Sequence, residues 1–210
     1  MNKRFSKTIK RIFDFLGALI EVVILSPLFG IVAILIKLDS KGPVFFRHER
    51  IGENGKSFCP FKFRTMKEGA IKEGLGYNIA EDDERITRMG KFLRKWGIDE
   101  LPQLVNVLMG EMSLVGPRPT FRYQVEKYSD FQKKRLLVRP GITGWALIHG
   151  RNLLSWEERI KYDVWYVENW SLWLDFKILF KTIKIVLLKK GIYGKGGTND
   201  PFIQNYERKI

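Results

Sequence analysis

The sequence has very little cysteine and histidine. Its single cysteine, Cys59, cannot form a disulfide within the chain, which indicates a reducing compartment. His48 and His149 lack the spacing of a metal-binding pair, and without a Cys/His cluster a zinc site is not expected. A P-loop and a GxGxxG motif after a strand are also absent, so neither of these nucleotide-binding motifs is present.

What the chain does contain is apolar mass and positive charge. Its 210 residues are 45% apolar and 29% charged, which provides enough apolar mass for a core and excludes a disordered chain. A mean hydropathy of −0.18 excludes a polytopic membrane protein. The length suits one domain with appendages. The net charge of +14 favours a polyanionic partner, either nucleic acid, an anionic membrane surface or a phosphorylated substrate.

One long apolar run lies near the N-terminus. Residues 15–36 are interrupted only by Glu21 and by Ser26-Pro27, and as a straight helix they would extend about 33 Å, enough to cross a bilayer. Pro27 predicts a kink, because it donates no N–H and its ring clashes with the carbonyl of Val23. The hydroxyl of Ser26 can return to a carbonyl near that position. Glu21 would cost about 3 kcal/mol at bilayer depth.

The flanks of this run favour a helix that returns to the side from which it enters. Residues 1–14 carry five basic side chains against one acidic one, and residues 37–50 carry four against two. Positive charge marks the cytoplasmic side, and a re-entrant hairpin over residues 1–40 satisfies both flanks. A kinked span and a buried core helix remain alternatives. A secretory signal peptide fits poorly, since no small-x-small cleavage site follows.

The C-terminal third predicts an amphipathic helix over residues 172–188. Its apolar stripe comprises Trp173, Phe176, Phe180, Ile183 and Leu187, and its basic face comprises Lys177, Lys181 and Lys184. Such a helix lies in a membrane interface or, alternatively, packs on a soluble core with a solvated lysine face. Residues 191–210 predict a Gly-rich, polar tail.

Residues 41–190 predict a mixed domain that is predominantly helical, with one small β-hairpin and no βαβ alternation. The hairpin pairs residues 44–46 with 58–63 around a turn at 52–55. Helices are predicted over residues 82–96, 99–109, 122–136 and 155–169. The whole chain is therefore expected to be an α+β fold with an N-terminal membrane helix broken at Ser26-Pro27 and interfacial amphipathic helices.

Two acidic clusters compete for a chemical role. Residues 81–84 fall at a predicted helix start, where carboxylates complement the helix dipole, and a structural role is favoured. Asp99-Glu100 also admits a capping role. However, Arg94 precedes this pair, and Arg118 follows it between two prolines that stiffen its backbone. Carboxylates near arginines at a helix N-terminus could hold a divalent metal and a phosphate together.

The order of motifs resembles one family, the bacterial monotopic phosphoglycosyl transferases or bacterial sugar transferases, in their small PglC-like form. The motifs that carry the resemblance span nearly the whole chain: KRIFD (10–14), Ser26-Pro27, KFRTM (62–66), LR (93–94), DELPQL (99–104), NVL (106–108), MS (112–113), VGPRP (115–119), RPGITG (139–144), GRN (150–152), YDV (162–164) and LDFK (174–177).

The resemblance implies transfer of a sugar 1-phosphate from a UDP-sugar to polyprenyl phosphate, with release of UMP. It implies that Asp99 is the nucleophile and a Mg²⁺ ligand, that a covalent phosphosugar forms on it, and that Glu100 assists proton transfer. The remaining site positions that it implies are the basic Lys62, Arg94 and Arg118 and the acidic Asp163 and Asp175. Mg²⁺ is the expected cofactor.

The same resemblance implies partners and a location. UDP-sugar, polyprenyl phosphate and anionic inner-membrane lipids are expected, with a homodimer left open and no nucleic acid. The domain is expected on the cytoplasmic face of the bacterial inner membrane. A loop at residues 69–80 that is slightly longer than in some small members, and a tail at 191–198 that favours an acetamido sugar, bear on sugar identity. Two other functions remain open: a non-catalytic basic membrane adaptor, and a glycosyltransferase that releases UDP.

Overall fold

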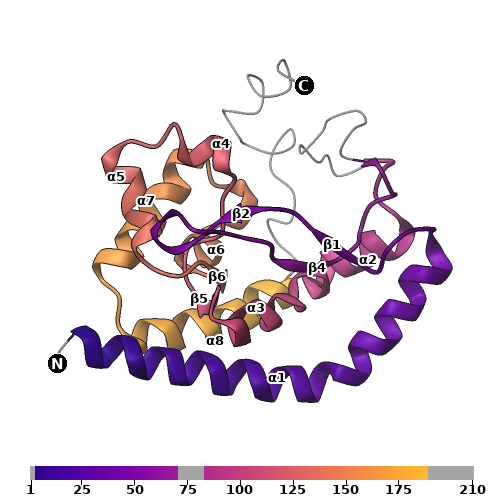
Figure 1. Ribbon diagram of the computed structural model, residues 1–210, viewed down its shortest axis with the longest axis horizontal. Coiled ribbons are helices and arrows are strands. Elements are labelled where there is room, and N and C mark those ends of the chain that lie inside the picture. Colours follow the sequence, from indigo (N-terminus) through magenta and orange to yellow (C-terminus); the bar gives the residue numbers. More distant parts are fainter. Residues whose placement is uncertain (1–2, 71–82, 189–210) are drawn as a thin grey trace.

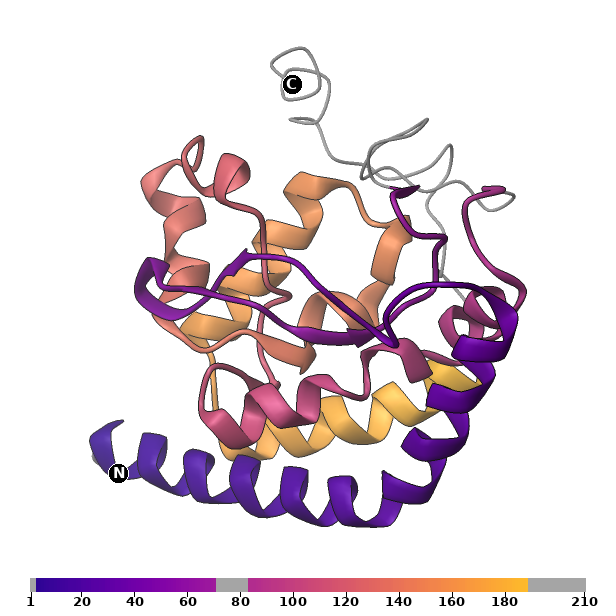
Figure 2. The ribbon, with the colours of Figure 1, turned by 45° about the vertical axis from the view of Figure 1, so that its right-hand side comes forward.

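The longest helix of the protein runs along one side of a mixed domain, with α3 and α8 beside it (Figures 1 and 2). The computed structural model describes residues 3–70 and 83–188; the tail at 191–210 and most of the loop at 69–80 lie outside these ranges. The helices are α1 (Lys3–Asp39), α2 (Arg88–Trp96), α3 (Gln103–Met109), α4 (Arg122–Val125), α5 (Asp130–Lys133), α6 (Trp145–His149), α7 (Trp156–Glu168) and α8 (Leu172–Leu188). The strands are β1 (Phe45–Arg47), β2 (Arg50–Ile51), β3 (Ser57–Phe58), β4 (Phe61–Phe63), β5 (Ser113–Val115) and β6 (Gly141–Thr143).

The predicted hairpin is confirmed, in two segments. β1 pairs antiparallel with β4 and β2 with β3, around a 3-10 turn at Glu53–Gly55. Asn54 and Gly55 both have positive φ in this turn, at 55° and 77°, a conformation that Gly and Asn adopt readily. The sequence analysis missed one pairing: β5 and β6 are parallel, and the chain between them holds α4 and α5.

The helices of the C-terminal half are confirmed more closely than those of the middle. α7 begins after a capping box at Ser155, and α8 has the predicted bounds. The helix predicted from residue 82 instead begins at Arg88, capped by the Thr87 side chain, because Asp83 folds back to an ion pair with Arg85 at 2.7 Å. The helix predicted over 122–136 is divided into α4, α5 and a 3-10 turn at Lys134–Leu137.

α1 passes through Pro27 as one continuous helix of 37 residues, so the break predicted at Ser26-Pro27 is replaced by a bend, visible in both ribbon views (Figures 1 and 2). The Ser26 hydroxyl donates to the carbonyl of Val23 at 2.9 Å. In a regular helix this carbonyl would accept a hydrogen bond from the N–H of residue 27, which proline lacks. The serine therefore supplies a donor to the backbone group that the proline leaves without one.

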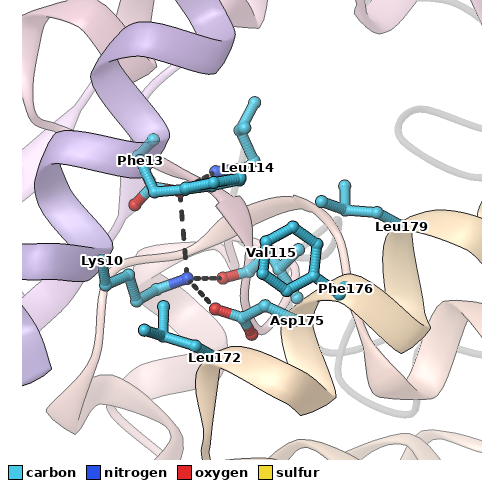
Figure 3. A pocket seen from close by; sticks show the side chains of 9 residues that line it. Lys10, Phe13, Leu114, Val115, Leu172, Asp175, Phe176 and Leu179 are labelled. Atoms are coloured by element: carbon cyan, nitrogen blue, oxygen red, sulfur yellow. Dashed lines mark hydrogen bonds and ion pairs between the residues drawn. The ribbon is translucent and has the colours of Figure 1, made fainter.

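The N-terminal half of α1 is fastened to the domain by three polar side chains. Arg11 donates to the carbonyls of Val107 and Leu108 at 2.6 and 2.9 Å, which caps the C-terminal end of α3. Lys10 donates to the Asp175 carboxylate at 2.6 Å, at the floor of a small pocket between α1 and α8 (Figure 3). Asp14 accepts hydrogen bonds from Ser113 and Leu114 at the start of β5. This half of the helix is therefore fixed to α3, β5 and α8.

The C-terminal end of α1 is fastened to the same domain. The Arg64 guanidinium donates to the carbonyls of Ser40, Lys41 and Pro43 at 2.8, 2.5 and 2.6 Å. In addition, the Asp39 carboxylate accepts from the backbone N–H of Met89 in the first turn of α2 at 3.0 Å. Both ends of α1 thus bind one folded unit.

The outward faces of α1 and α8 are apolar. By length and composition α1 could cross a membrane: its most apolar stretch has a mean hydropathy of 2.7 and is only 11% buried. On α8, Leu174 and Ile178 face the core and Phe176 of the predicted stripe packs on Phe13 of α1, whereas the other four members of the stripe are exposed, with Trp173 77% and Phe180 73% exposed. Most of the stripe therefore does not pack on the described part of the chain, which favours an interfacial α8 over one that packs on a soluble core.

Candidate active site

The hairpin places Lys62 at the centre of the domain. Asn106 of α3 is fully buried and ties the hairpin down: its amide oxygen accepts from the N–H of Phe61 at 2.8 Å, and its amide nitrogen donates to the carbonyl of Cys59 at 3.1 Å. Lys62 follows directly in β4, and its ammonium donates to the Glu100 carboxylate at 3.0 Å. The expected proximity of Lys62 to the acidic pair is thus observed.

α2 brings Arg94 toward the same centre through a close approach of backbones. A Cβ on Gly90 would lie 2.0 Å from the carbonyl oxygen of Thr65, so only glycine allows this distance. One turn later, Arg94 Nε donates to the Thr65 hydroxyl at 2.8 Å. The helix then ends at Gly97, which has φ of 69°.

Asp99 and Glu100 occupy a short 3-10 turn, Ile98–Glu100, between α2 and α3. The helix predicted over 99–109 therefore begins later, at Gln103, and Asp99 is not its N-cap: that position belongs to Pro102. The capping role considered for Asp99 is thus wrong, and the carboxylate is available for other interactions.

Glu100 is held on both sides by cations. Arg118 donates to it through two nitrogens, at 2.6 and 3.1 Å, and Lys62 donates at 3.0 Å. Burial alone would raise the pKa of Glu100, but Arg118 and Lys62 outweigh burial and lower this pKa well below its ordinary value. Glu100 is therefore an ionised carboxylate with its oxygens occupied.

Asp99 is held differently. Within residues 3–70 and 83–188 its carboxylate makes no hydrogen bond or ion pair. Burial and the adjacent Glu100 charge raise its pKa, against the opposing effect of Lys62, Arg94 and Arg118. The pair thus has two environments: one carboxylate is neutralised by direct contacts, and the other lies unpaired within the same positive field. An unpaired carboxylate among cations is suited to nucleophilic attack on a phosphate.

Mg²⁺ usually takes one or two carboxylates and completes its shell with water and substrate phosphates. No group of three His, Cys, Asp or Glu side chains that could hold a metal occurs in the described part of the chain. Within the described residues the donor set near Asp99 therefore fits an ion that arrives with a diphosphate, to which Asp99 would contribute one carboxylate.

Arg118 owes its position to three glycines. A Cβ on Gly116 or Gly141 would lie 2.4 or 2.0 Å from the facing backbone, and one on Gly144 would lie 2.2 Å from the carbonyl of Gly116. These contacts let the loop after β5 pack directly on β6. Arg118 follows at once between Pro117 and Pro119, as the sequence analysis expected for a stiff cation.

The structure does not bring the other two predicted acidic residues into this cluster. Asp163 is 1% exposed and accepts from Arg135 at 2.5 Å. Asp175 accepts from Lys10 at the junction of α1 and α8 (Figure 3). It also accepts from Tyr166 and Trp170. Both carboxylates are bound by internal partners and lie outside the cluster of Lys62, Asp99, Glu100 and Arg118.

Three arginines that belong to the surroundings of the site were absent from the predicted set. Arg151, with φ of 53°, has a pKa lowered by burial and by the nearby charge of Arg118, against the opposing charges of Glu100 and Asp99. Arg50 lies over the Phe121 ring and near Lys62, whose pKa is lowered by burial first and, to a smaller extent, by the charge of Arg50. Arg135 donates to the carbonyl of Arg118 at 2.9 Å. The motif GRN (150–152) marked Arg151 in the sequence; nothing local marked Arg50 or Arg135.

The fold and the site first define a class: an enzyme with a long apolar helix that could enter a membrane and with the carboxylate of Asp99, unpaired within the described residues, among fixed cations, an arrangement suited to phosphate chemistry. The model of the bacterial sugar transferase family matches residues 5–189. The chain therefore belongs to that family, and is a transferase, as the order of its motifs indicated.

Similar proteins fall into two lengths. The uncharacterized sugar transferase EpsL of Bacillus subtilis is 45% identical over 184 residues, which cover 88% of this chain and 90% of EpsL. The undecaprenyl-phosphate galactose phosphotransferase of Salmonella typhimurium is 42% identical over 205 residues, covering 91% of this chain but 43% of the relative. The UDP-N-acetylgalactosamine-undecaprenyl-phosphate N-acetylgalactosaminephosphotransferase of Aeromonas hydrophila is 47% identical over 185 residues, or 85% and 44%. The chain spans less than half of these two longer relatives.

Proposed function

We propose that the protein transfers a sugar 1-phosphate from a UDP-sugar to polyprenyl phosphate and releases UMP, as a membrane step of glycan assembly. The observation that carries the proposal is the unpaired Asp99 beside a Glu100 neutralised by Lys62 and Arg118. The names of the Salmonella and Aeromonas relatives, both phosphotransferases that act on undecaprenyl phosphate, support the same reaction.

The reaction proceeds in two displacements at one phosphorus atom. In the first, a carboxylate oxygen of Asp99 attacks the phosphorus that carries the sugar, and the bond from that phosphorus to the bridging oxygen breaks, so that UMP leaves. In the second, an oxygen of polyprenyl phosphate attacks the same phosphorus, and the bond to Asp99 breaks. Each displacement places negative charge near Lys62, Arg94 and Arg118, which stabilise it.

Substrate binding also changes the state of Glu100. In the resting site Lys62 and Arg118 hold its oxygens. A diphosphate competes for the same two cations, and each contact that it takes from Glu100 raises the pKa of that carboxyl. Glu100 is thereby converted from an occupied anion into a base that can accept the proton of the incoming polyprenyl phosphate.

Magnesium fits this site as a companion of the substrate. Asp99 would hold the ion together with diphosphate oxygens, and the bound ion would neutralise phosphate charge. The residues of the chain still provide the nucleophile, the fixed cations and the base.

The location proposed is the cytoplasmic face of the bacterial inner membrane, with α1 dipping into the bilayer and returning. The support is that α1 binds one domain on both sides of its apolar run: Arg11 before the run and Asp39 after it contact α3 and α2. A helix whose two ends are held by the same folded unit does not place them on opposite faces of a membrane. The basic flanks agree with this topology.

The central test detects the covalent intermediate. Detergent-purified protein is mixed with Mg²⁺ and either UDP-galactose or UDP-N-acetylgalactosamine, without acceptor, and its intact mass is measured. The expected result is an adduct of one sugar phosphate with release of UMP, lost in Asp99→Asn and kept in Asp130→Asn, which changes an exposed aspartate that pairs with Lys133 in α5. Turnover by the wild type with no adduct would refute the covalent route, and release of UDP would indicate direct glycosyl transfer.

A separate test addresses topology. Single cysteines placed before Lys3 and after Lys41, in a Cys59→Ser background, are labelled from either side of sealed inverted and right-side-out vesicles. Both positions are expected to react from the cytoplasmic side. Labelling from opposite sides would show that α1 crosses the bilayer.

A further inference from the structure

A buried ion pair lies directly behind the active-site loop. Arg135, in the 3-10 turn Lys134–Leu137, and Asp163 of α7 are 5% and 1% exposed, and their charged groups are 2.5 Å apart. The nitrogen of Arg135 that binds Asp163 also donates to the backbone carbonyl of Arg118 at 2.9 Å. One guanidinium therefore joins a buried carboxylate to the main chain of the residue that holds Glu100.

The local sequence explains why Arg118 needs such a contact. Pro117 and Pro119 have no N–H, so two of the three consecutive residues can be held only through their carbonyls. The carbonyl of Pro117 accepts from Gly141 N at 2.9 Å, and that of Thr120 accepts from Ile51 N at 2.8 Å. Between these two anchors, Arg135 holds the carbonyl of Arg118.

Arg135 is itself oriented by a second partner. It donates to the hydroxyl of Tyr128 at 2.7 Å, and that hydroxyl lies 2.9 Å from the hydroxyl of Thr120. The network thus returns to the active-site loop two residues beyond Arg118. A buried charge pair of this kind adds little net stability compared with an apolar pair, but it fixes geometry in a way that apolar contacts do not.

We propose that Asp163 and Arg135 are positioning residues, which set the backbone of Arg118 so that its guanidinium reaches Glu100 and the transferring phosphate. The proposal rests on the function proposed above and refines it, because it assigns Asp163 an action through Arg118 in place of contact with substrate. Neither residue touches the reacting atoms.

The test is a double-mutant cycle on the rate of adduct formation, measured as kcat/KM for the UDP-sugar half-reaction. Asp163→Asn should lower this rate by roughly tenfold to a hundredfold, the effect of a displacement near 1 Å. In an Arg118→Ala background the same substitution should change the rate less than about twofold, because the residue through which it acts is gone. Independent, multiplicative effects would overturn the proposal.

Two further variants separate positioning from folding. Tyr128→Phe removes one acceptor of Arg135 and leaves the ion pair with Asp163 in place, so it can replace Asp163→Asn in the test if that variant does not fold. Tyr128→Phe should lower the rate several-fold, and only when Arg118 is present. Val164→Ala removes packing in the apolar cluster that Val164 shares with Tyr128, but no hydrogen bond of the network, so it should lower the thermal stability and leave the rate unchanged at a temperature well below its Tm. A rate loss in Val164→Ala as large as that in Tyr128→Phe would contradict the inference. A wild type that forms no adduct would instead refute the proposed function, and this inference with it.

Discussion

Asn106 joins the hairpin to α3, and its removal is expected to loosen the site from a distance. Its amide binds the N–H of Phe61 and the carbonyl of Cys59, and it also donates to the Glu111 carboxylate at 2.7 Å. Asn106→Leu keeps the volume and leaves two backbone groups without partners. Each buried unpaired group costs about 1–3 kcal/mol. Since Cys59 and Phe61 are only half-buried, the expected total is about 3 kcal/mol.

Such a loss corresponds to a fall in Tm of roughly 6–12 °C for a domain of this size. It is measured by thermal unfolding in detergent, followed by tryptophan fluorescence. Hydrogen exchange adds a local readout, since the amide of Phe61 should lose protection while that of Gly116, which binds the carbonyl of Thr143, should keep it. Because Lys62 follows Phe61, adduct formation should fall as well.

The matched control is Asn169→Leu. That asparagine is exposed, and its side chain donates one hydrogen bond, to the carbonyl of Trp165 at 2.9 Å, which the backbone N–H of the same residue also binds, so loss of the side-chain bond should change stability by no more than about 0.5 kcal/mol. Equal Tm values for the two variants, or unchanged protection at Phe61, would refute the assignment of Asn106 as the anchor of the hairpin.

Three other predictions follow from the same geometry. Gly90→Ala should destabilise the protein by about 3 kcal/mol or more, because the new Cβ meets the Thr65 carbonyl, whereas Gly69→Ala, with open space around it, should lose only what its positive φ costs, about 1 kcal/mol. Asp99→Asn should raise Tm at neutral pH, because the raised pKa of Asp99 makes its charged form unfavourable in the folded state. In membranes, a spin label attached at position 180 should be relaxed more strongly by oxygen, which concentrates in lipid, and a spin label at position 177 more strongly by a water-soluble nickel chelate.

The stability gained by Asp99→Asn should depend on pH. A folded-state pKa above the ordinary value of 3.8 means that the stability contributed by protonated Asp99 is fully present below that value and is lost as the pH rises through the raised pKa. The advantage of Asp99→Asn should therefore vanish at low pH and reach its maximum above the raised pKa. A difference that is constant with pH would contradict this reasoning. Adduct formation, which needs the ionised carboxylate, should increase over the same pH range.

The spin-label prediction depends on a difference in polarity between the surroundings of positions 177 and 180 of α8. Equal access of both reagents to positions 177 and 180 would mean that α8 lies wholly in water or wholly in lipid. For the first prediction, equal Tm losses at positions 90 and 69 would show that the close approach of α2 to Thr65 is not required.

Local patterns were sufficient to predict much of this protein. The 3.6-residue periodicity of residues 172–188 predicted α8 with its bounds, and the Gly-containing turn predicted the hairpin. The predicted polar cluster of Lys62, Arg94, Asp99, Glu100 and Arg118 came from the resemblance and from the two prolines around Arg118. These features depend on residues adjacent in sequence or on a recognisable order of motifs.

Long-range contacts decided the rest. A helix over 122–136 has adequate periodicity, yet Gln124 and Ser129 form separate caps, so the segment divides. Asp163 and Asp175 lie in motifs that the resemblance marks as site positions. The fold, however, supplies Arg135 and Lys10 as their partners, from 28 and 165 residues away. No local pattern records which distant cation reaches a given carboxylate.

The sequence by itself thus determined the family, the long apolar helix, the amphipathic helix α8 and the chemical type of the site, because these depend on composition, periodicity and motif order. Only the tertiary structure decided which of two adjacent carboxylates is unpaired. Lys62 comes from β4 and Arg118 from the loop after β5, and both reach Glu100, whereas neither pairs with Asp99. That asymmetry arises from packing between distant segments, and it is what leaves Asp99 available for the proposed attack on phosphorus.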